Sequence, residues 1–462
     1  MKTEAKTKRA NVDFLNGPIM KSMVVFAIPL FLSSIFQQLY NTMDTVIIGY
    51  TLGETALAAM GAAAAIYDLL IGFAFGIGNG LAIVTARSYG CGDQEKLKKS
   101  VAASIVIGVV VTVAITVLTR FILYPFLEVL NTPAEIIDQA YTYISTITLF
   151  IAVMCAYNLC AGILRAIGNS LMPLVFLIIS SLLNIVLDLV FIIRLHMGIQ
   201  GAAVATVLAQ LVSVILCLIY IYNKAKILLP GRKHFVWDGY LYTEMTAQGM
   251  SMGFMSCIVN AGTAILQSGI NDLGYLVIAG HTAARKLFQF IMMPFIAMSQ
   301  TISTFVSQNR GADQPVRIRK AMKCGYLYGV VVSAVMTVLM WFGAPVMVRL
   351  LSGSSDSVVL GNGALYLRVV APFLSILGIL NCTRNALQAI GQKILPVLSS
   401  VIELIGKILF VWLLIPRFQY MAVIFCEPVI WCFMTLELVV SFWRDPFIRS
   451  GRRDAEASDS KA

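Results

Sequence analysis

Long apolar runs recur along the chain from about residue 20 to residue 443, and short polar connections separate them. Most runs approach the ~20 residues that an α-helix needs to cross the ~30 Å hydrocarbon core of a bilayer. The pattern therefore predicts an all-α, multi-pass membrane protein with twelve transmembrane helices. Their approximate bounds are residues 19–46, 56–85, 98–124, 136–160, 172–193, 200–222, 240–269, 276–306, 320–347, 358–382, 394–415 and 420–443.

The composition supports a membrane protein and excludes several other classes. Hydrophobic residues make up 59% of the 462 residues and charged residues only 12%, whereas about a quarter of a soluble protein is charged. The formal net charge of +11 comes from the connections between spans and not from a basic domain, so we expect no nucleic-acid partner. The nine cysteines lack CxxC spacing, which favours neither a disulfide framework nor a zinc site.

Lysine and arginine are distributed unevenly between the two sets of connections. With both termini in the cytoplasm, 26 of the 34 Lys and Arg residues fall on the cytoplasmic side, five outside and three within spans. Cytoplasmic loops of membrane proteins carry such an excess. We therefore expect a multi-pass protein of the cell inner (cytoplasmic) membrane with both termini in the cytoplasm, and an even number of spans agrees with both termini lying on one side.

The two halves of the chain resemble each other. NLCAGILRAIGNSLMPL (158–174) aligns with NCTRNALQAIGQKILPV (381–397), and GDQEKLKKS (92–100) aligns with ADQPVRIRK (312–320), at nearly the same offset. Because each half has six spans, the repeat is parallel, which is typical of transporters that alternate access between two lobes. The expected organisation is an N-terminal lobe at 1–223, a cytoplasmic linker at 224–239, a C-terminal lobe at 240–445 and a polar cytoplasmic tail at 446–462.

Polar side chains interrupt three spans of the N-terminal half at helical spacing, so each set shares one helix face. An ionisable group in the hydrocarbon core is costly and is therefore a functional candidate. Pro29 removes a backbone hydrogen bond from the first of these spans and permits a bend. The sets are Gln37, Asn41 (or Tyr40) and Asp44 in span one, Ser181, Asn184 and Asp188 in span five, and Thr206, Gln210 and Ser213 in span six.

If these faces converge, two carboxylates, an amide and a hydroxyl come together. Such oxygen ligands suit Na⁺, and a pair of adjacent carboxylates can instead share a proton. The alternative is that Asn184 and Asp188 only join helices by hydrogen bonds. We favour an ion site, because Ser, Thr or Asn could join helices without two buried acids.

The C-terminal half has different polar residues. Lys407 stands where the repeat places Asn184, and Glu403 precedes it by four residues, an order that favours an ion pair. We expect Arg285 to pair across the cleft between lobes and Glu427 to lie near the outer, water-accessible end of its span. Span seven carries uncharged polar residues on one face, among them Asn260 and Gln267.

The repeated segments, together with IPLFLSSIFQQLYNTMDTVIIGYTLGETALAAMG (28–61) and NIVLD (184–188), resemble the MATE (multidrug and toxic compound extrusion) transporters, nearest their DinF-like bacterial branch. The resemblance covers nearly the whole chain. It implies a two-lobed, V-shaped exporter driven by Na⁺ or H⁺, without another cofactor. It also implies a coupling site at Asp44, Asn184, Asp188 and Thr206, and a helix bend at Pro29. We expect the substrate cavity at Gln37, Tyr40, Asn41, Asn158, Ser181, Gln210, Asn260 and Gln267.

The residues and the resemblance together predict a monomeric secondary antiporter rather than an enzyme. It would export amphipathic, cationic organic compounds by alternating access in exchange for Na⁺ or H⁺. No Walker A motif is present, so ATP is not expected to drive transport. The alternative is a lipid-linked saccharide flippase of the related superfamily, against which the acidic N-terminal half argues. An intramembrane enzyme would need a nucleophile or metal constellation, which the three widely separated histidines do not supply.

Overall fold

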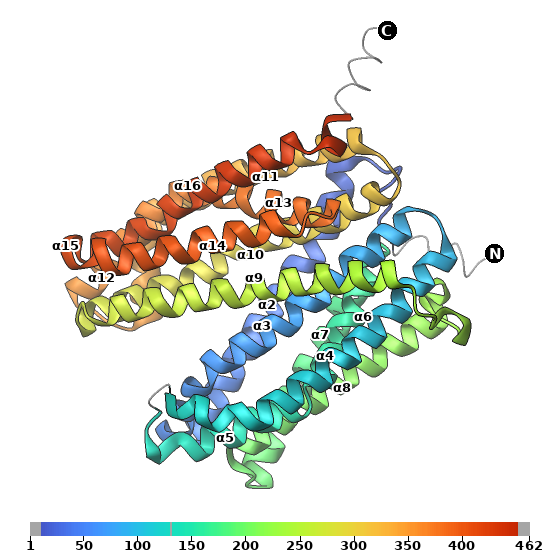
Figure 1. Cartoon of the computed structure of the whole chain (residues 1–462). Helices are drawn as coiled ribbons and strands as arrows, with labels where there is room; N and C mark the ends of the chain where they lie inside the picture. The colour runs from blue at the N-terminus through green and yellow to red at the C-terminus, as the bar shows by residue number, and fades with distance from the viewer. Residues whose placement is uncertain (1–10, 130–131, 451–462) are drawn as a thin grey trace. The chain divides into compact units, whose positions relative to one another are not determined.

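The computed structural model describes residues 11–129 and 132–450, and this part of the chain is helical without β-strands (Figure 1). In the first half the α-helices are α2 (Ile19–Leu52), α3 (Glu54–Gly90), α4 (Gln94–Val129), α5 (Ala134–Leu149), α6 (Ile151–Ala166), α7 (Leu171–Asp188) and α8 (Gly198–Lys224). In the second half they are α9 (Gly239–Asn271), α10 (Tyr275–Gly311), α11 (Pro315–Ser352), α12 (Ser357–Val370), α13 (Leu374–Ile390), α14 (Ile394–Leu409), α15 (Ile415–Phe418) and α16 (Tyr420–Arg444).

The described helices are long and apolar enough to form the predicted twelve spans. Eleven segments pass as single spans, and the pair α5 and α6, bent by 49° around Phe150, makes a twelfth if it is counted as one. The predicted all-α architecture is thus confirmed. Several helices run beyond their predicted ends because helix continues into the polar connections. For example, α3 extends to Gly90 rather than 85.

The chain divides into two compact units. Unit 1 contains Ile28–Ser256 and the N-terminal segment that ends at Asp13, and unit 2 contains Phe14–Ala27 and the chain from Cys257 onward. The helices α2 and α9 therefore each contribute residues to both units. The lobe boundaries expected from the repeat, 1–223 and 240–445, follow sequence similarity rather than contacts and stay a prediction.

Two kinds of local structure recur in both halves of the repeat. Gly168 and Gly391, which align in sequence, follow α6 and α13 with φ angles of +87° and +108°. Only glycine adopts this left-handed conformation without strain, which is why it ends helices. A π-helical turn also follows α7 (Leu189–Arg194) and α14 (Phe410–Leu414). Such turns are rare and often occur near functional sites.

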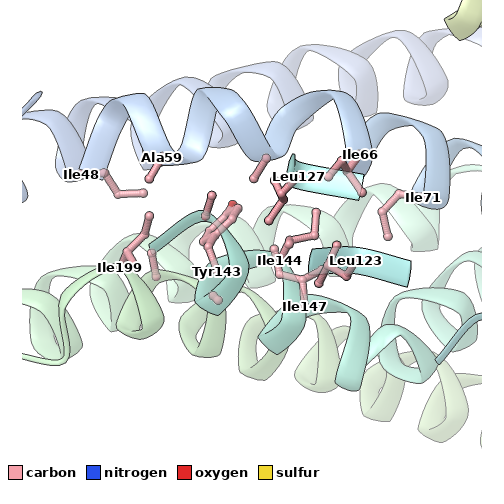
Figure 2. Packing of buried hydrophobic residues seen from close by; sticks show 14 of the residues in the cluster. Ile48, Ala59, Ile66, Ile71, Leu123, Leu127, Tyr143, Ile144, Ile147 and Ile199 are labelled. Carbon is pink, nitrogen blue, oxygen red and sulfur yellow. The ribbon is translucent and has the colours of Figure 1, made fainter. Parts of the chain in front are cut away.

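Unit 1 is held together by a large apolar cluster that joins six helices, with Ile151 and Met154 contributed by α6. Figure 2 shows its side chains pointing toward one another from α2, α3, α4, α5 and α8. Ile48, Leu127, Ile144 and Ile147 are at most 1% exposed. In a bilayer the hydrophobic effect does not drive helices together, so close van der Waals packing of this kind is what holds them.

Helices α3 and α9 approach each other within unit 1 at two pairs of glycines. A Cβ atom on Gly76 would lie 2.6 Å from the carbonyl oxygen of Met252, and one on Gly80 would lie 2.6 Å from the Cα of Gly249. Gly253 packs against the same surface, 2.7 Å from the Cβ position of Gly76. Glycines four apart let two membrane helices bring their backbones together.

We expect Gly80→Ala to destabilise the protein. The added methyl group would meet backbone atoms that cannot move without separating α3 from α9, and overpacking of this kind costs about 1–3 kcal/mol. Gly61→Ala on the same helix is the control, because no atom lies within 4 Å of its Cβ position. Thermal unfolding of the two purified variants in detergent makes the comparison. Equal melting temperatures would contradict the close approach.

Candidate functional site

Helices α2, α7 and α8 bring four predicted residues together in unit 1. With its amide oriented so that the nitrogen faces both acids, Asn184 donates hydrogen bonds to Asp44 Oδ1 (2.9 Å) and Asp188 Oδ2 (3.1 Å). The Asn184 carbonyl oxygen accepts a hydrogen bond from the backbone N–H of Thr206 (3.3 Å). The phenol of Tyr40 donates to the Thr206 hydroxyl (3.1 Å). We call Asp44, Asn184, Asp188 and Thr206 the acid cluster.

The acid cluster is buried and contains two carboxyl groups. Its four side chains are between 0% and 6% exposed. None of the ion pairs found among the described residues involves Asp44 or Asp188. Two carboxylates without a partner of opposite charge repel each other strongly in a low-dielectric interior. The cluster therefore favours any cation or proton that can reach it.

Among the predicted site residues of unit 1, three buried polar atoms have no hydrogen-bond partner in the part of the chain that the structure describes. They are Asp188 Oδ1, Asn158 Nδ2 on α6 and Gln210 Oε1 on α8. Buried polar atoms are nearly always satisfied, so each orphan indicates a water molecule, ion or ligand. The free Asp188 oxygen fits a bound cation or proton, and the two amide atoms fit polar groups of a substrate.

The local sequence explains how the acid cluster is assembled. Asn184 and Asp188 are one helical turn apart, so they share a face of α7, and the π-helical turn begins directly after Asp188. Ser181, one turn before Asn184, is buried on the same face at 7% exposure. On α8, Ser213 does not join the cluster, because its hydroxyl donates to the carbonyl of Phe176 (3.0 Å).

Other predicted cavity residues lie outside the acid cluster. Of the alternatives Tyr40 and Asn41, it is Tyr40 that contacts Thr206, whereas Gln37 and Asn41 are exposed. Asn260 and Gln267 belong to unit 2. Gln267 is exposed and donates to Asn271 Oδ1 (2.9 Å). Their role as cavity residues stays a prediction.

Pro29 lies within α2, which is helical from Ile19 to Leu52. The proline has no N–H to donate, and its carbonyl accepts a hydrogen bond from the Ser33 hydroxyl (2.8 Å). The predicted bend at Pro29 stays a prediction.

The acid cluster has the ligand types of a site for a light cation. The two carboxylates and the Thr206 hydroxyl are hard oxygen donors that suit Na⁺, and two adjacent carboxylates can instead hold one proton between them. Across residues 11–129 and 132–450, no three His, Cys, Asp or Glu side chains come together as a metal site requires. The cluster's own two acids therefore match a monovalent ion rather than a transition metal.

Unit 2 contains a buried charge network that joins α10, α13, α14 and α16. Lys407 is 1% exposed and lies 2.8 Å from Glu403 and 3.8 Å from Glu427. Arg285 pairs with Glu427 at 2.7 Å, and Arg384 approaches Glu403 at 3.9 Å. These three cations and two acids are called the charge network below.

Two expectations about the charge network were wrong. Arg285 was expected to pair across the cleft, but it pairs with Glu427 of its own unit. Glu427 was expected to be accessible to water, but it is 7% exposed and also accepts a hydrogen bond from the Tyr366 hydroxyl (3.3 Å). Lys407 and Glu403 do lie in the contact that their spacing favours. Gly262 makes room for the lysine stem, because a Cβ atom there would lie only 3.1 Å from Lys407 Cδ.

The sequence is similar to a known protein family and to individual members of it. The MatE family model matches residues 29–190 and 252–413. The probable multidrug resistance protein YpnP of Bacillus subtilis (strain 168) is 26% identical over 392 residues, which cover 85% of this chain and 87% of YpnP. The multidrug export protein MepA of Staphylococcus saprophyticus is 23% identical over 404 residues, 86% of this chain and 88% of MepA.

Solved structures share the fold over nearly the whole chain. One is described as the outward-facing conformation of a multidrug resistance MATE family transporter of the MOP superfamily. It aligns with a TM-score of 0.83 at 21% sequence identity and covers 97% of this chain and 99% of its own. At this identity the match concerns the fold alone.

Proposed function

Since the chain belongs to the MatE family of membrane transporters, we propose that it is an antiporter that exports amphipathic, cationic organic compounds in exchange for Na⁺ or H⁺. The observation that carries this proposal is the acid cluster, in which one amide nitrogen contacts two buried carboxylates. A transporter of this kind needs no covalent chemistry. We further propose that it lies in the cell inner membrane with both termini in the cytoplasm, because the lysine and arginine bias favours that orientation.

Binding at the acid cluster would couple the ion to transport. A cation or proton between Asp44 and Asp188 relieves the repulsion between their carboxylates. A ligand shifts a conformational equilibrium only by the difference between its affinities for the two states. The ion therefore drives the cycle if one conformational state holds the two acids closer together, or less exposed to water, than the other state does. Tyr40 and Thr206 would position the oxygen ligands around the ion.

The proposed substrate class follows from charge and from the relatives. Two buried acids attract a cationic compound as they attract an inorganic cation. The orphaned atoms Asn158 Nδ2 and Gln210 Oε1 can hydrogen-bond polar groups of a varied set of molecules. YpnP and MepA are similar to this chain along most of their length, and they are described as a probable multidrug resistance protein and a multidrug export protein.

Transport by purified protein in liposomes tests the proposal. A fluorescent cationic dye is loaded into proteoliposomes, and a Na⁺ gradient or a H⁺ gradient is imposed in separate experiments. We expect one of the two gradients to drive dye movement against its concentration gradient, while liposomes without protein show none. Movement under neither gradient would contradict the antiporter and favour the flippase for lipid-linked saccharides.

A further inference from the structure

An apolar groove of about 390 Å³ runs along the surface of unit 1, between α4, α6 and α8. Its volume falls within the ~300–1,000 Å³ of typical ligand pockets. Val101, Ile105 and Val109 line it on α4, and Leu218 and Ile221 line it on α8. The segment Leu228–Pro230, which follows α8, closes one end of the groove.

The chemistry of the groove fits a hydrocarbon chain and no polar molecule. Its lining has a single hydroxyl, that of Thr112, which already donates to the carbonyl of Gly108 within the same helix (2.7 Å). Val109 and Leu218 are 58% and 52% exposed. Exposed aliphatic side chains on membrane-spanning helices face lipid. A cationic drug would find no polar partner here.

Basic side chains gather at the end of the groove that Leu228–Pro230 closes. Lys98 precedes Val101 by three residues on α4, and Lys224 follows Ile221 by three residues on α8. Each lysine therefore lies on the groove face of its helix, one turn beyond the last lining residue. The exposed Lys226 and Arg232 lie at the same end, in the segment that follows α8. We call these four residues the basic rim.

The dimensions match one leaflet of a bilayer. From Val101 to Val113 the groove follows α4 for twelve residues, which is about 18 Å of helix. One leaflet contributes about half of the ~30 Å hydrocarbon core. A lipid whose acyl chain lies along the groove would therefore place its headgroup beside the basic rim.

We propose that this groove is a binding site for one anionic phospholipid. The acyl chain packs along α4, α6 and α8, and the phosphate contacts Lys98 and Lys224. Basic residues at the ends of membrane helices are known to recognise anionic headgroups. A zwitterionic lipid has the same acyl chain, but the positive group of its headgroup is repelled by the basic rim.

A second copy of the chain fits the groove less well. Two copies related by a two-fold axis place the same surface on both sides of the interface. The basic rims of the two copies would then approach each other, and like charges brought together oppose association. An anionic lipid neutralises the basic rim, whereas a second copy doubles its charge.

Competition between lipids, read out by native mass spectrometry of the full-length protein, tests the headgroup part of the proposal. The protein is offered phosphatidylglycerol and phosphatidylcholine with identical acyl chains. We expect the wild type to retain phosphatidylglycerol preferentially, and Lys98→Gln with Lys224→Gln to lower the preference about fivefold for each lysine removed. Lys320→Gln with Lys323→Gln, two exposed lysines of α11, is the matched control and should leave it unchanged.

A substitution that fills the groove tests whether the acyl chain of the lipid binds there. Ala156→Trp places a large ring among the lining residues and should remove the retained phosphatidylglycerol, whereas Leu327→Trp on the exposed surface of α11 should not. Monodisperse size-exclusion profiles establish that both variants are folded. The proposal is overturned if the wild type shows no headgroup preference, or if the lysine pair changes nothing. A wild-type dimer that dissociates in Ala156→Trp would likewise overturn it, in favour of a second copy.

Discussion

Dye export falls to the level of membranes without the transporter when either acid of the acid cluster becomes an amide, as Asp44→Asn or Asp188→Asn. Each change removes one of the two charges that would bind the coupling ion, and keeps the size of the side chain. Asn184 would still contact both positions, so the helices should stay packed and the protein should reach the membrane in normal amounts. Cells that express each variant are compared for dye efflux and for the amount of transporter in the membrane.

Asp138→Asn provides the matched control for these variants, because Asp138 is an exposed acid of α5 in the same unit. It should export dye as the wild type does. Full export by both Asp44→Asn and Asp188→Asn would show that the acid cluster only joins helices. Loss of export together with loss of protein from the membrane would point to the same structural role.

The second large effect is expected at the charge network. Lys407→Met leaves Glu403 and Glu427 buried without the cation between them. Breaking a buried ion pair by removing one partner costs about 3–5 kcal/mol when the remaining charge is left uncompensated, and here Arg285 and Arg384 stay beside the two acids and reduce that cost. We therefore expect a marked loss of stability in thermal unfolding of the purified protein, whereas Lys286→Met on the exposed surface of α10 should change little.

A double variant separates the ion pair from the packing of the lysine stem. Glu403→Gln with Lys407→Met removes a negative and a positive group together. The loss of stability in the double variant should be smaller than the sum of the losses in the two single variants, because the effects of substitutions within one network are not additive. If the two losses simply add, the network does not stabilise unit 2 through its charges.

Contacts along one helix were predictable, and contacts between helices were not. The spacing of Asn184 and Asp188, and that of Glu403 and Lys407, fixes a shared face, because one helical turn separates the members of each pair. Periodicity alone did not place α2 and α8 around that face; only the family resemblance implied that Asp44 and Thr206 join it. The pairing of Arg285 with Glu427, 142 residues apart, depends on tertiary packing that periodicity does not contain.

Two further features show the same limit. Tyr40 and Asn41 are both close enough to the helical stripe of Asp44, so packing against Thr206 decides which one joins it. Gly76 and Gly80 are a recognisable pair in the sequence, as are Gly249 and Gly253. Nothing in the sequence says that these two pairs meet.

The position of Lys407 has a consequence for the number of ions in a transport cycle. It occupies the repeat position of Asn184, and its ammonium group is a counter-ion for Glu403 and Glu427 that is covalently attached to the chain. Such a counter-ion cannot dissociate, and its local concentration is independent of the sodium concentration on either side. In the proposed exchange, the coupling stoichiometry is therefore set by unit 1 alone. In that exchange, unit 2 would behave as if its ion were permanently bound.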